Sequence, residues 1–393
     1  MAVSQSPRGL DDAQISRAVS VARIVLIIGL VFLHYDRFPN ARMSPFDGFD
    51  DDFHPLATWV SSTVLFMLFS AVPLLSMVSG WFFFSFDHIS IAALARKIIA
   101  RMRTLYVTLV FWNALVLISL FGLYHAFPQL PIFGLTNISF ANARWLDYFN
   151  AVFGATKHPV AFQFWFVRDL CVTVLVSPLL WLALKRAPWV GVLVLGTAWL
   201  AGSHLGVFFR TDVPFFFYLG AMVRMRPTLR LDLPWNTTLL LAFVYVALAG
   251  LRALAPEFVD FADGAPRWLD VATRAMRIVG VLACWGLVCR LAATGLGARI
   301  APYGGLSYFL FATHWPLIEF VKAGSWQLMP AETDAWMLVH YVASALITVS
   351  ISLGLGAALA QVFPGVFAWM NGGRELGQAR SVRPQPMAAA APP

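Results

Sequence analysis

The long apolar segments of this sequence contain few ionisable side chains, and these are the residues that could do chemistry. An imidazole can accept a proton near neutral pH, and a guanidinium can hold an anion through several hydrogen bonds. Such groups are costly at membrane depth, which makes each of them a functional candidate. They come as three pairs: Arg23 with His34, Arg168 with Asp169, and His314 with Glu319.

Arg23 and His34 are eleven residues apart in one apolar run. At about 100° and 1.5 Å per residue, this spacing puts both on one face of a helix, about 16 Å apart along its axis. A substrate that reaches through a membrane could therefore contact both. The alternative is that Arg23 extends to one layer of lipid headgroups and His34 lies at the other.

The elements that must position these residues are membrane helices. Of the 393 residues, 59% are hydrophobic and only 12% are charged, whereas soluble proteins contain about 25% charged residues. Apolar runs recur without a polar stretch long enough for a separate core. We predict an all-α, polytopic membrane protein with a cytoplasmic segment at 1–18, one membrane domain at 19–370 and a disordered cytoplasmic tail at 371–393.

Runs of about 20 apolar residues predict about ten transmembrane helices. Most of the 28 Lys and Arg residues fall in alternate loops, which predicts that both termini are cytoplasmic. This topology explains the net charge of +8 without a nucleic-acid partner. The predicted spans are Val19–Tyr35, Trp59–Phe86, Leu105–Tyr124, Phe164–Leu184, Trp189–Val207, Val213–Val223, Trp235–Leu254, Met276–Leu291, Ile300–Val321 and Met337–Phe363.

Other common catalytic patterns are missing from the sequence. The three cysteines lie in apolar runs and form neither a metal-binding nor a disulfide pattern, so we predict no metal site. There is no serine nucleophile elbow and no phosphate-binding glycine loop. The candidate chemistry therefore rests on the buried histidines and charges.

Several motifs resemble the membrane-bound acyltransferase-3 family, over nearly the whole membrane domain. The first is an Arg, ten intervening residues and a His, here ARIVLIIGLVFLH up to His34. The others follow in the family's order: SGWFF at 79–83, KIIARMRTLYVTLVFWN at 97–113, FWFVRDL at 164–170 with SPLL at 177–180, and GGLSYFLFATHWP at 304–316. Two features depart from the family pattern: Thr108 stands where Pro is usual, and the basic turn is not a strict Arg-x-x-Arg.

The resemblance implies O-acyl transfer from cytoplasmic acyl-CoA, with acetyl-CoA as the expected donor substrate and no tightly bound cofactor. The implied acceptor is a sugar hydroxyl on a lipid-linked oligosaccharide or nascent exopolysaccharide, such as mannose in a xanthan-type polymer. A sugar hydroxyl is a poor nucleophile, so its acylation needs a base. His34 is the candidate, as general base or as carrier of the acyl group. Membrane lipids and other polysaccharide-synthesis proteins are the further partners expected.

Two groups of residues are assigned roles beside His34. Arg23, with Arg101 and Arg103 of the basic turn, would bind the phosphates of acyl-CoA, although basic residues in a cytoplasmic loop also act as a topology signal. Arg168 would stabilise the thioester oxyanion and Asp169 would orient a histidine, unless the two form a structural ion pair.

Three further residues are assigned to substrate binding. Glu319 could orient an imidazole or bind sugar hydroxyls, and Trp165 could stack on a sugar face. His314 could contact substrate, with a hydrogen-bonded core histidine as the alternative.

Two other functions compete with acyl transfer. A secondary transporter or a flippase of a lipid-linked sugar would also have about ten helices and a few buried charges, but it should show paired inverted repeats, and the sequence has no such pairing. The other competing function is that of a catalytically inactive scaffold for polysaccharide synthesis. The presence of both Arg23 and His34 argues against it.

Overall fold

The chain forms a bundle of helices in a computed structural model that describes residues 11–84, 90–226, 232–261, 264–330 and 332–376. All regular secondary structure within these residues is helical, which confirms the predicted class. The α-helices are α1 Asp12–Leu33, α2 Pro55–Leu68, α3 Ala71–Phe83, α4 Ile91–Ala126, α5 Trp145–Phe153, α6 Trp165–Leu175, α7 Ser177–Arg186, α8 Pro188–Leu200, α9 Asp212–Met225, α10 Trp235–Ala253, α11 Arg267–Ala292, α12 Gly295–Ile300, α13 Ser307–Leu328, α14 Asp334–Val362 and α15 Pro364–Met370. The short 3-10 helices are η1 Pro131–Leu135, η2 Phe162–Phe164, η3 Ala255–Glu257 and η4 Ala301–Leu306.

All the predicted spans coincide with helices, but several of these helices are too short to cross a membrane. In the described residues, six helices are long and apolar enough to cross a membrane when α2 and α3 are counted as one helix. Helices α6 and α7 form a further candidate span that is bent by 59°. The hairpin helices α8 and α9 have 13 and 14 residues, a rise of about 20 Å each, against about 30 Å of bilayer hydrocarbon. The prediction of about ten complete spans is therefore not confirmed.

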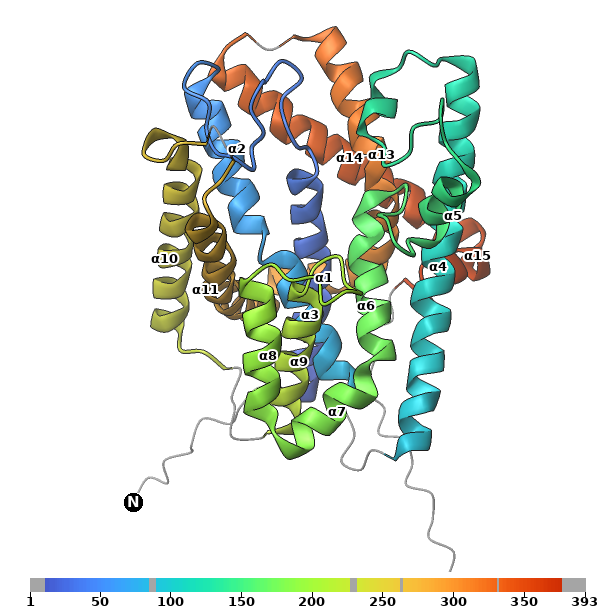
Figure 1. The fold of residues 1–393 in the computed structure, drawn as a ribbon, viewed down its shortest axis with the longest axis vertical. Coiled ribbons are helices and arrows are strands. Elements are labelled where there is room, and N and C mark those ends of the chain that lie inside the picture. The colour runs from blue at the N-terminus through green and yellow to red at the C-terminus, as the bar shows by residue number, and fades with distance from the viewer. Residues whose placement is uncertain (1–10, 85–89, 227–231, 262–263, 331, 377–393) are drawn as a thin grey trace, which may run out of the picture.

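Helix α1 runs through the middle of the bundle (Figure 1). It begins with a capping box, in which the Asp11 carboxylate accepts from the Gln14 amide and the Gln14 side chain accepts from the Asp11 amide. It packs against α2, α3, α11, α13 and α14, and small or β-branched residues such as Val21, Ala22 and Val31 are fully buried. The position of His34 at its end is thus set by the core of the bundle.

The second span breaks between α2 and α3, at Phe69 and Ser70. Near the break the carbonyls of Phe66 and Met67 need partners that lipid cannot supply, and the Phe66 carbonyl accepts from the Phe69 amide at 3.3 Å. The Tyr245 hydroxyl from α10 lies 3.0 Å and 2.8 Å from these two carbonyl oxygens and 2.6 Å from the Ser70 hydroxyl. One buried tyrosine therefore closes the break and ties α10 to α2.

The helix crossing of α3 and α9 is unusually close. A Cβ at Gly80 would lie 1.9 Å from the carbonyl oxygen of Phe217, and a Cβ at Gly220 would lie 1.9 Å from that of Met77. Small residues allow such close approach of backbones in membrane bundles. The crossing holds the short α8–α9 hairpin against the core (Figure 1).

Helix α13 breaks directly after His314. Trp315 has non-helical φ and ψ of −112° and 131°, and Pro316, which has no amide N–H, follows it. The side-chain amide of Gln163 donates to the Trp315 carbonyl at 3.3 Å. The break thus gains a buried partner from η2.

The two described ends of the chain lie on the same side of the bundle. The Asn371 amide donates to the Gly305 carbonyl at 2.6 Å, and a Cβ at the adjacent Gly304 would lie 2.7 Å from the carbonyl oxygen of Ser20 in α1. The predicted tail at 371–393 therefore starts with residues that pack on the bundle, and 377–393 lies outside the described residues.

Candidate active site

Two histidines that are 280 residues apart in the sequence form a hydrogen-bonded pair. His34 is the C-terminal cap of α1, and His314 lies on α13 just before its break. His34 Nδ1 lies 2.8 Å from His314 Nε2, and the two ring planes differ by 13°. His314 is completely buried, whereas His34 is half-buried. We call this arrangement the histidine pair.

The hydrogen bonds determine which nitrogen of each ring carries the proton. His314 Nδ1 lies 3.1 Å from the Leu310 carbonyl oxygen, which can only accept, so Nδ1 donates. In neutral His314, Nε2 then has a lone pair and accepts from His34 Nδ1. This leaves Nε2 of neutral His34 with a lone pair, as a general base requires.

Aromatic residues hold the His34 ring in place. The Phe162 ring on η2 meets the His34 ring edge-on, with centroids 5.0 Å apart, and its centroid is 5.4 Å from that of Trp315. Phe162 lies two residues before the FWFVRDL motif, on the 3-10 turn that leads into α6. The segment just before that motif therefore contributes to the site.

A second polar cluster lies just beyond His34. Lys322 Nζ is 2.7 Å from the Glu319 carboxylate and donates to the Tyr35 carbonyl at 3.0 Å. The Tyr35 hydroxyl is 2.8 Å from His340 Nδ1. Glu319 therefore pairs with a lysine three residues further along its own helix, and not with the imidazole that we expected. The spacing of Glu319 and Lys322 was the sequence signal for this pair.

A cavity of about 690 Å³ beside the first half of α1 brings together Arg23, Arg101 and Arg374. We call it the arginine pocket. Phe311 also lines this cavity, and its ring centroid lies 6.0 Å from that of His314. The arginine pocket thus extends from the three guanidiniums to the residue that contacts the histidine pair.

The arginine pocket differs in two residues from the predicted phosphate site. Arg103 is exposed and does not line the cavity, because it lies on the outer face of α4. Arg374 lines it instead: its guanidinium lies 4.8 Å from the Tyr308 ring, and its Nη1 donates to the Asn371 carbonyl at 3.1 Å. No motif marked Arg374, because it follows the last predicted span.

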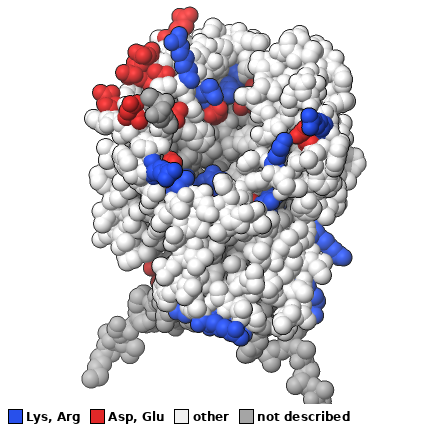
Figure 2. Space-filling view, in the orientation of Figure 1, with Lys and Arg blue, Asp and Glu red and all other residues white. Residues whose placement is uncertain are grey.

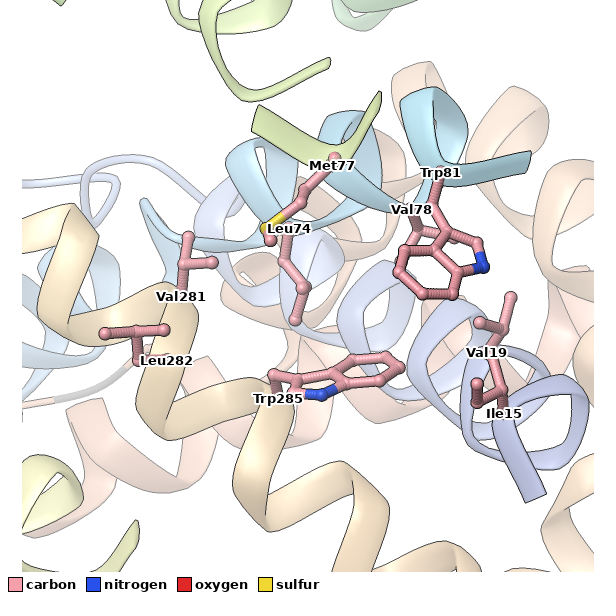
Figure 3. Close-up of a pocket in the computed structure, with 10 residues that line it drawn as sticks. Ile15, Val19, Leu74, Met77, Val78, Trp81, Val281, Leu282 and Trp285 are labelled. Carbon is pink, nitrogen blue, oxygen red and sulfur yellow. The ribbon is translucent and has the colours of Figure 1, made fainter. Parts of the chain in front are cut away.

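An apolar cavity of about 440 Å³ lies between α1, α3 and α11. Figure 3 shows Trp81 and Trp285 facing it, together with aliphatic side chains such as Leu74 and Val281. None of its ten lining residues carries a charge. Of these two cavities, only the arginine pocket is therefore suited to an anionic ligand.

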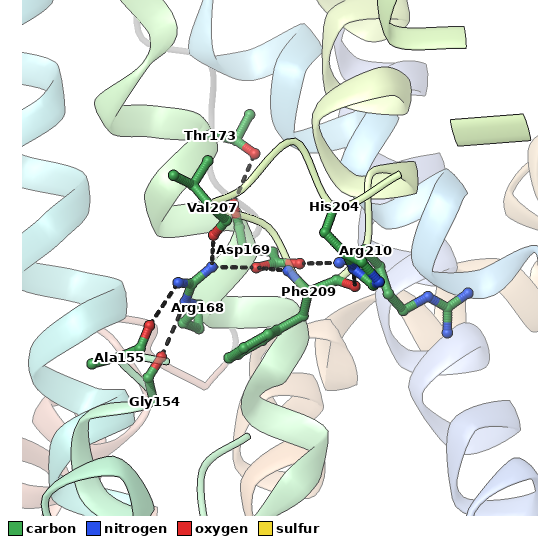
Figure 4. A network of polar contacts seen from close by, with 9 residues as sticks. All are labelled: Gly154, Ala155, Arg168, Asp169, Thr173, His204, Val207, Phe209 and Arg210. Atoms are coloured by element: carbon green, nitrogen blue, oxygen red, sulfur yellow. Dashed lines mark hydrogen bonds and ion pairs between the residues drawn. The ribbon is translucent and has the colours of Figure 1, made fainter. Parts of the chain in front are cut away.

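Asp169 belongs to a separate polar network (Figure 4). Its carboxylate accepts from the backbone amides of Phe209 at 3.1 Å and Arg210 at 2.7 Å, and from Arg168 Nη1 at 2.8 Å. The side chain is fully buried. The Asp169 carboxylate is thus held by two loop amides and an arginine, and not by the histidine that we expected it to orient.

Arg168 is fully engaged in the same network. It donates to the carbonyls of Gly154, Ala155 and Val207 in addition to its ion pair with Asp169 (Figure 4). The pair therefore fastens two loops to α6, and this geometry fits the structural ion pair better than the oxyanion role.

Trp165 lies near this network. The guanidinium of Arg210 is 4.7 Å from its ring centroid. Trp165 does not line the arginine pocket. The structure therefore pairs Trp165 with a cation, and a stacking role toward a sugar stays a prediction.

Comparison with known proteins gives two matches. A family model described as an acyltransferase domain, acyltransferase-3, matches residues 17–357. The chain is 26% identical over 387 residues to the succinoglycan biosynthesis protein ExoH of Rhizobium meliloti (strain 1021). The aligned region covers 95% of this chain and 96% of the relative. No solved structure matches.

The network around Asp169 predicts a stability effect. Asp169→Ala should lower the free energy of unfolding by about 3–5 kcal/mol, because it leaves Arg168 buried without its counter-charge. The melting temperature of the purified protein measures this. Asp147→Ala is the matched control, since Asp147 pairs with Lys157 at the surface, and its melting temperature should change little. A stable Asp169→Ala protein that cannot transfer acyl groups would instead restore the catalytic role.

Proposed function

We propose that this chain, which belongs to the acyltransferase-3 family, transfers an acyl group from acyl-CoA to a sugar hydroxyl of a polysaccharide or its lipid-linked precursor. The observation that carries the proposal is the histidine pair at the end of the arginine pocket. The pair offers a base for the hydroxyl, and the adjoining cavity offers cations for an anionic donor.

The arginine pocket suits the phosphates of acyl-CoA. Guanidiniums bind phosphate through paired, charged hydrogen bonds, and Arg23, Arg101 and Arg374 line one cavity. Along α1, His34 lies about 16 Å from Arg23. The extended pantetheine arm would carry the thioester across this distance. We propose acetyl-CoA as the donor.

The proton steps follow from the tautomers of the histidine pair. His34 Nε2 takes the proton of the sugar hydroxyl while the hydroxyl oxygen attacks the thioester carbonyl. The ester C–O bond forms, the C–S bond breaks, and the proton passes from the imidazolium to the departing thiolate. His314 is a positioning residue, because its Nε2 accepts from His34 Nδ1 and its own Nδ1 donates to the Leu310 carbonyl.

A second route uses the same lone pair as a nucleophile. His34 Nε2 attacks the thioester, CoA leaves, and the sugar hydroxyl then takes the acyl group from the imidazole. In this route the donor and acceptor need not be bound together. The two routes differ in whether acyl-CoA alone leaves an acyl group on the protein.

The acceptor is proposed from the relative that is named for succinoglycan biosynthesis. The alignment covers nearly all of both chains, which supports a polysaccharide acceptor here. A mannose hydroxyl of a xanthan-type repeat unit, nascent or lipid-linked, is the specific acceptor that we propose. The chain would then act in the bacterial inner membrane beside other polysaccharide-synthesis proteins.

His34→Ala should remove the acyl groups from the host polysaccharide, because loss of a positioned base slows transfer by about 10²- to 10⁴-fold. Proton NMR of polysaccharide from native, variant and deletion strains measures the acyl content. His125→Ala, which replaces an exposed histidine at the end of α4, is the control and should leave acylation unchanged.

Two results would contradict this proposal. One is native acyl content in a His34→Ala strain whose membranes contain normal amounts of the protein. The other is a deletion strain that acylates its polysaccharide normally but exports less of it, which would favour the flippase.

The proposed binding of acyl-CoA in the arginine pocket can be tested separately from the role of His34. Arg374→Gln should raise the KM for acyl-CoA by about 10-fold and change kcat little, since a charged hydrogen bond contributes about 1.5–3 kcal/mol. Initial rates of the purified protein measure both constants. Arg103→Gln is the control, because Arg103 is exposed and outside the arginine pocket. An unchanged KM for Arg374→Gln, or an equal rise for Arg103→Gln, would exclude this cavity as the donor site.

A further inference from the structure

A cavity of about 1000 Å³ lies apart from the histidine pair and the arginine pocket. We call it the vestibule; it is lined by the ends of α2, α10 and α11, the turn between α8 and α9, and the loop after α1. Figure 2 shows this face hollowed near its middle, with basic residues in and beside the hollow. Because α8 and α9 are short, the chain turns back before it reaches the level of the other helix ends (Figure 1). The loops that form its rim are predicted to face the outside of the cell.

The vestibule is lined by four arginines and three aspartates, which are Arg210, Arg252, Arg274 and Arg277 with Asp47, Asp212 and Asp270. Asp212 Oδ2 lies 2.8 Å from Arg210 Nη2 and 3.2 Å from Arg277 Nη1, so one carboxylate faces two guanidiniums. Asp212 is 1% exposed and Arg277 is 6% exposed, whereas the Arg210 side chain is 41% exposed and can reach a ligand in the cavity. Arg274 adds a third guanidinium, which lies 4.0 Å from the half-exposed Asp270. The arginines therefore exceed the carboxylates by one, and an anion would compensate this charge.

Two buried polar atoms of the Asp212–Arg277 ion pair have no hydrogen-bond partner among the described residues. They are Nε of Arg277, which can only donate, and Oδ1 of Asp212, which can only accept while ionised. Unpaired buried groups of this kind cost about 1–3 kcal/mol each. Both atoms are shielded from the open space of the vestibule, so they do not themselves mark a contact with a ligand.

The guanidiniums are held in position before any ligand arrives. The Arg277 guanidinium lies 4.6 Å from the Phe69 ring centroid, and the Arg252 guanidinium lies 4.5 Å from the Phe66 ring centroid. The floor of the vestibule is fixed as well, because the backbone amide of Arg210 donates to Asp169. Preorganised donors of this kind favour a specific anion over a mobile counter-ion.

We propose that the vestibule binds a carboxylate-bearing sugar unit of the acceptor glycan. Arg277 and Arg210 would take the carboxylate, with Asp212 holding the two guanidiniums in place. That the ligand is a glycan rests on the proposed function. That it is acidic rests on the charges of the vestibule itself.

The test is calorimetric titration of the purified full-length protein in lipid nanodiscs. The probes are a glucuronate trisaccharide, a neutral glucose trisaccharide and inorganic phosphate. The acidic trisaccharide should bind saturably and at least 10-fold more tightly than either of the others. Arg277→Lys and Arg210→Gln should each weaken its binding about 10-fold, whereas Arg267→Gln, an exposed arginine on α11 outside the vestibule, should leave it unchanged.

Other outcomes would overturn the inference. These are no binding of the acidic trisaccharide, equal binding of the neutral one, equal binding of phosphate, or an unchanged affinity in folded Arg277→Lys and Arg210→Gln proteins. His34→Ala should bind the acidic trisaccharide normally while losing transfer. Binding without any transfer by the native protein would therefore contradict the proposed function alone, and transfer without binding would contradict this inference alone.

Discussion

Lipid offers no hydrogen bonds, so the polar groups freed where a membrane helix breaks must find partners inside the protein. This constraint shapes the bundle. Tyr245 of α10 closes the break between α2 and α3, Gln163 donates to the Trp315 carbonyl where α13 breaks, and Asp169 accepts from the amides at the α8–α9 turn. In each case the partner comes from another part of the chain. The helix breaks are therefore also the points at which distant segments are tied together.

The same breaks create the places where a reaction can occur. The break in α13 follows directly on His314, whose ring meets His34 at the end of α1. Because the α8–α9 hairpin is short, space for the vestibule remains above its turn. The arginine pocket adjoins the histidine pair through Phe311. The proposed reaction between an anionic cytoplasmic donor and an outer glycan would need a base with a cavity for each substrate, and these features are the candidates for those three parts.

The sequence predicts those parts of this arrangement that depend on local spacing. Apolar run lengths locate the helices, and helical periodicity puts Arg23 and His34 on one face of α1. Contacts between distant segments have no such local signal. The pairing of His34 with His314, the place of Arg374 in the arginine pocket and the loop carbonyls that hold Arg168 all depend on how helices pack. The predicted span Val213–Val223 is already short in the sequence, but Trp189–Val207 is predicted as a longer span than α8, and the vestibule above the α8–α9 turn has no local sequence signal.

If His34 and His314 act as one unit, kcat of the single and double alanine variants shows it most directly. Residues that act as a unit have non-additive effects. We therefore predict that His314→Ala lowers kcat by about 10²-fold or more and that the double variant is no slower than His34→Ala alone. Losses that multiply in the double variant, or a folded His314→Ala protein with native kcat, would contradict the account.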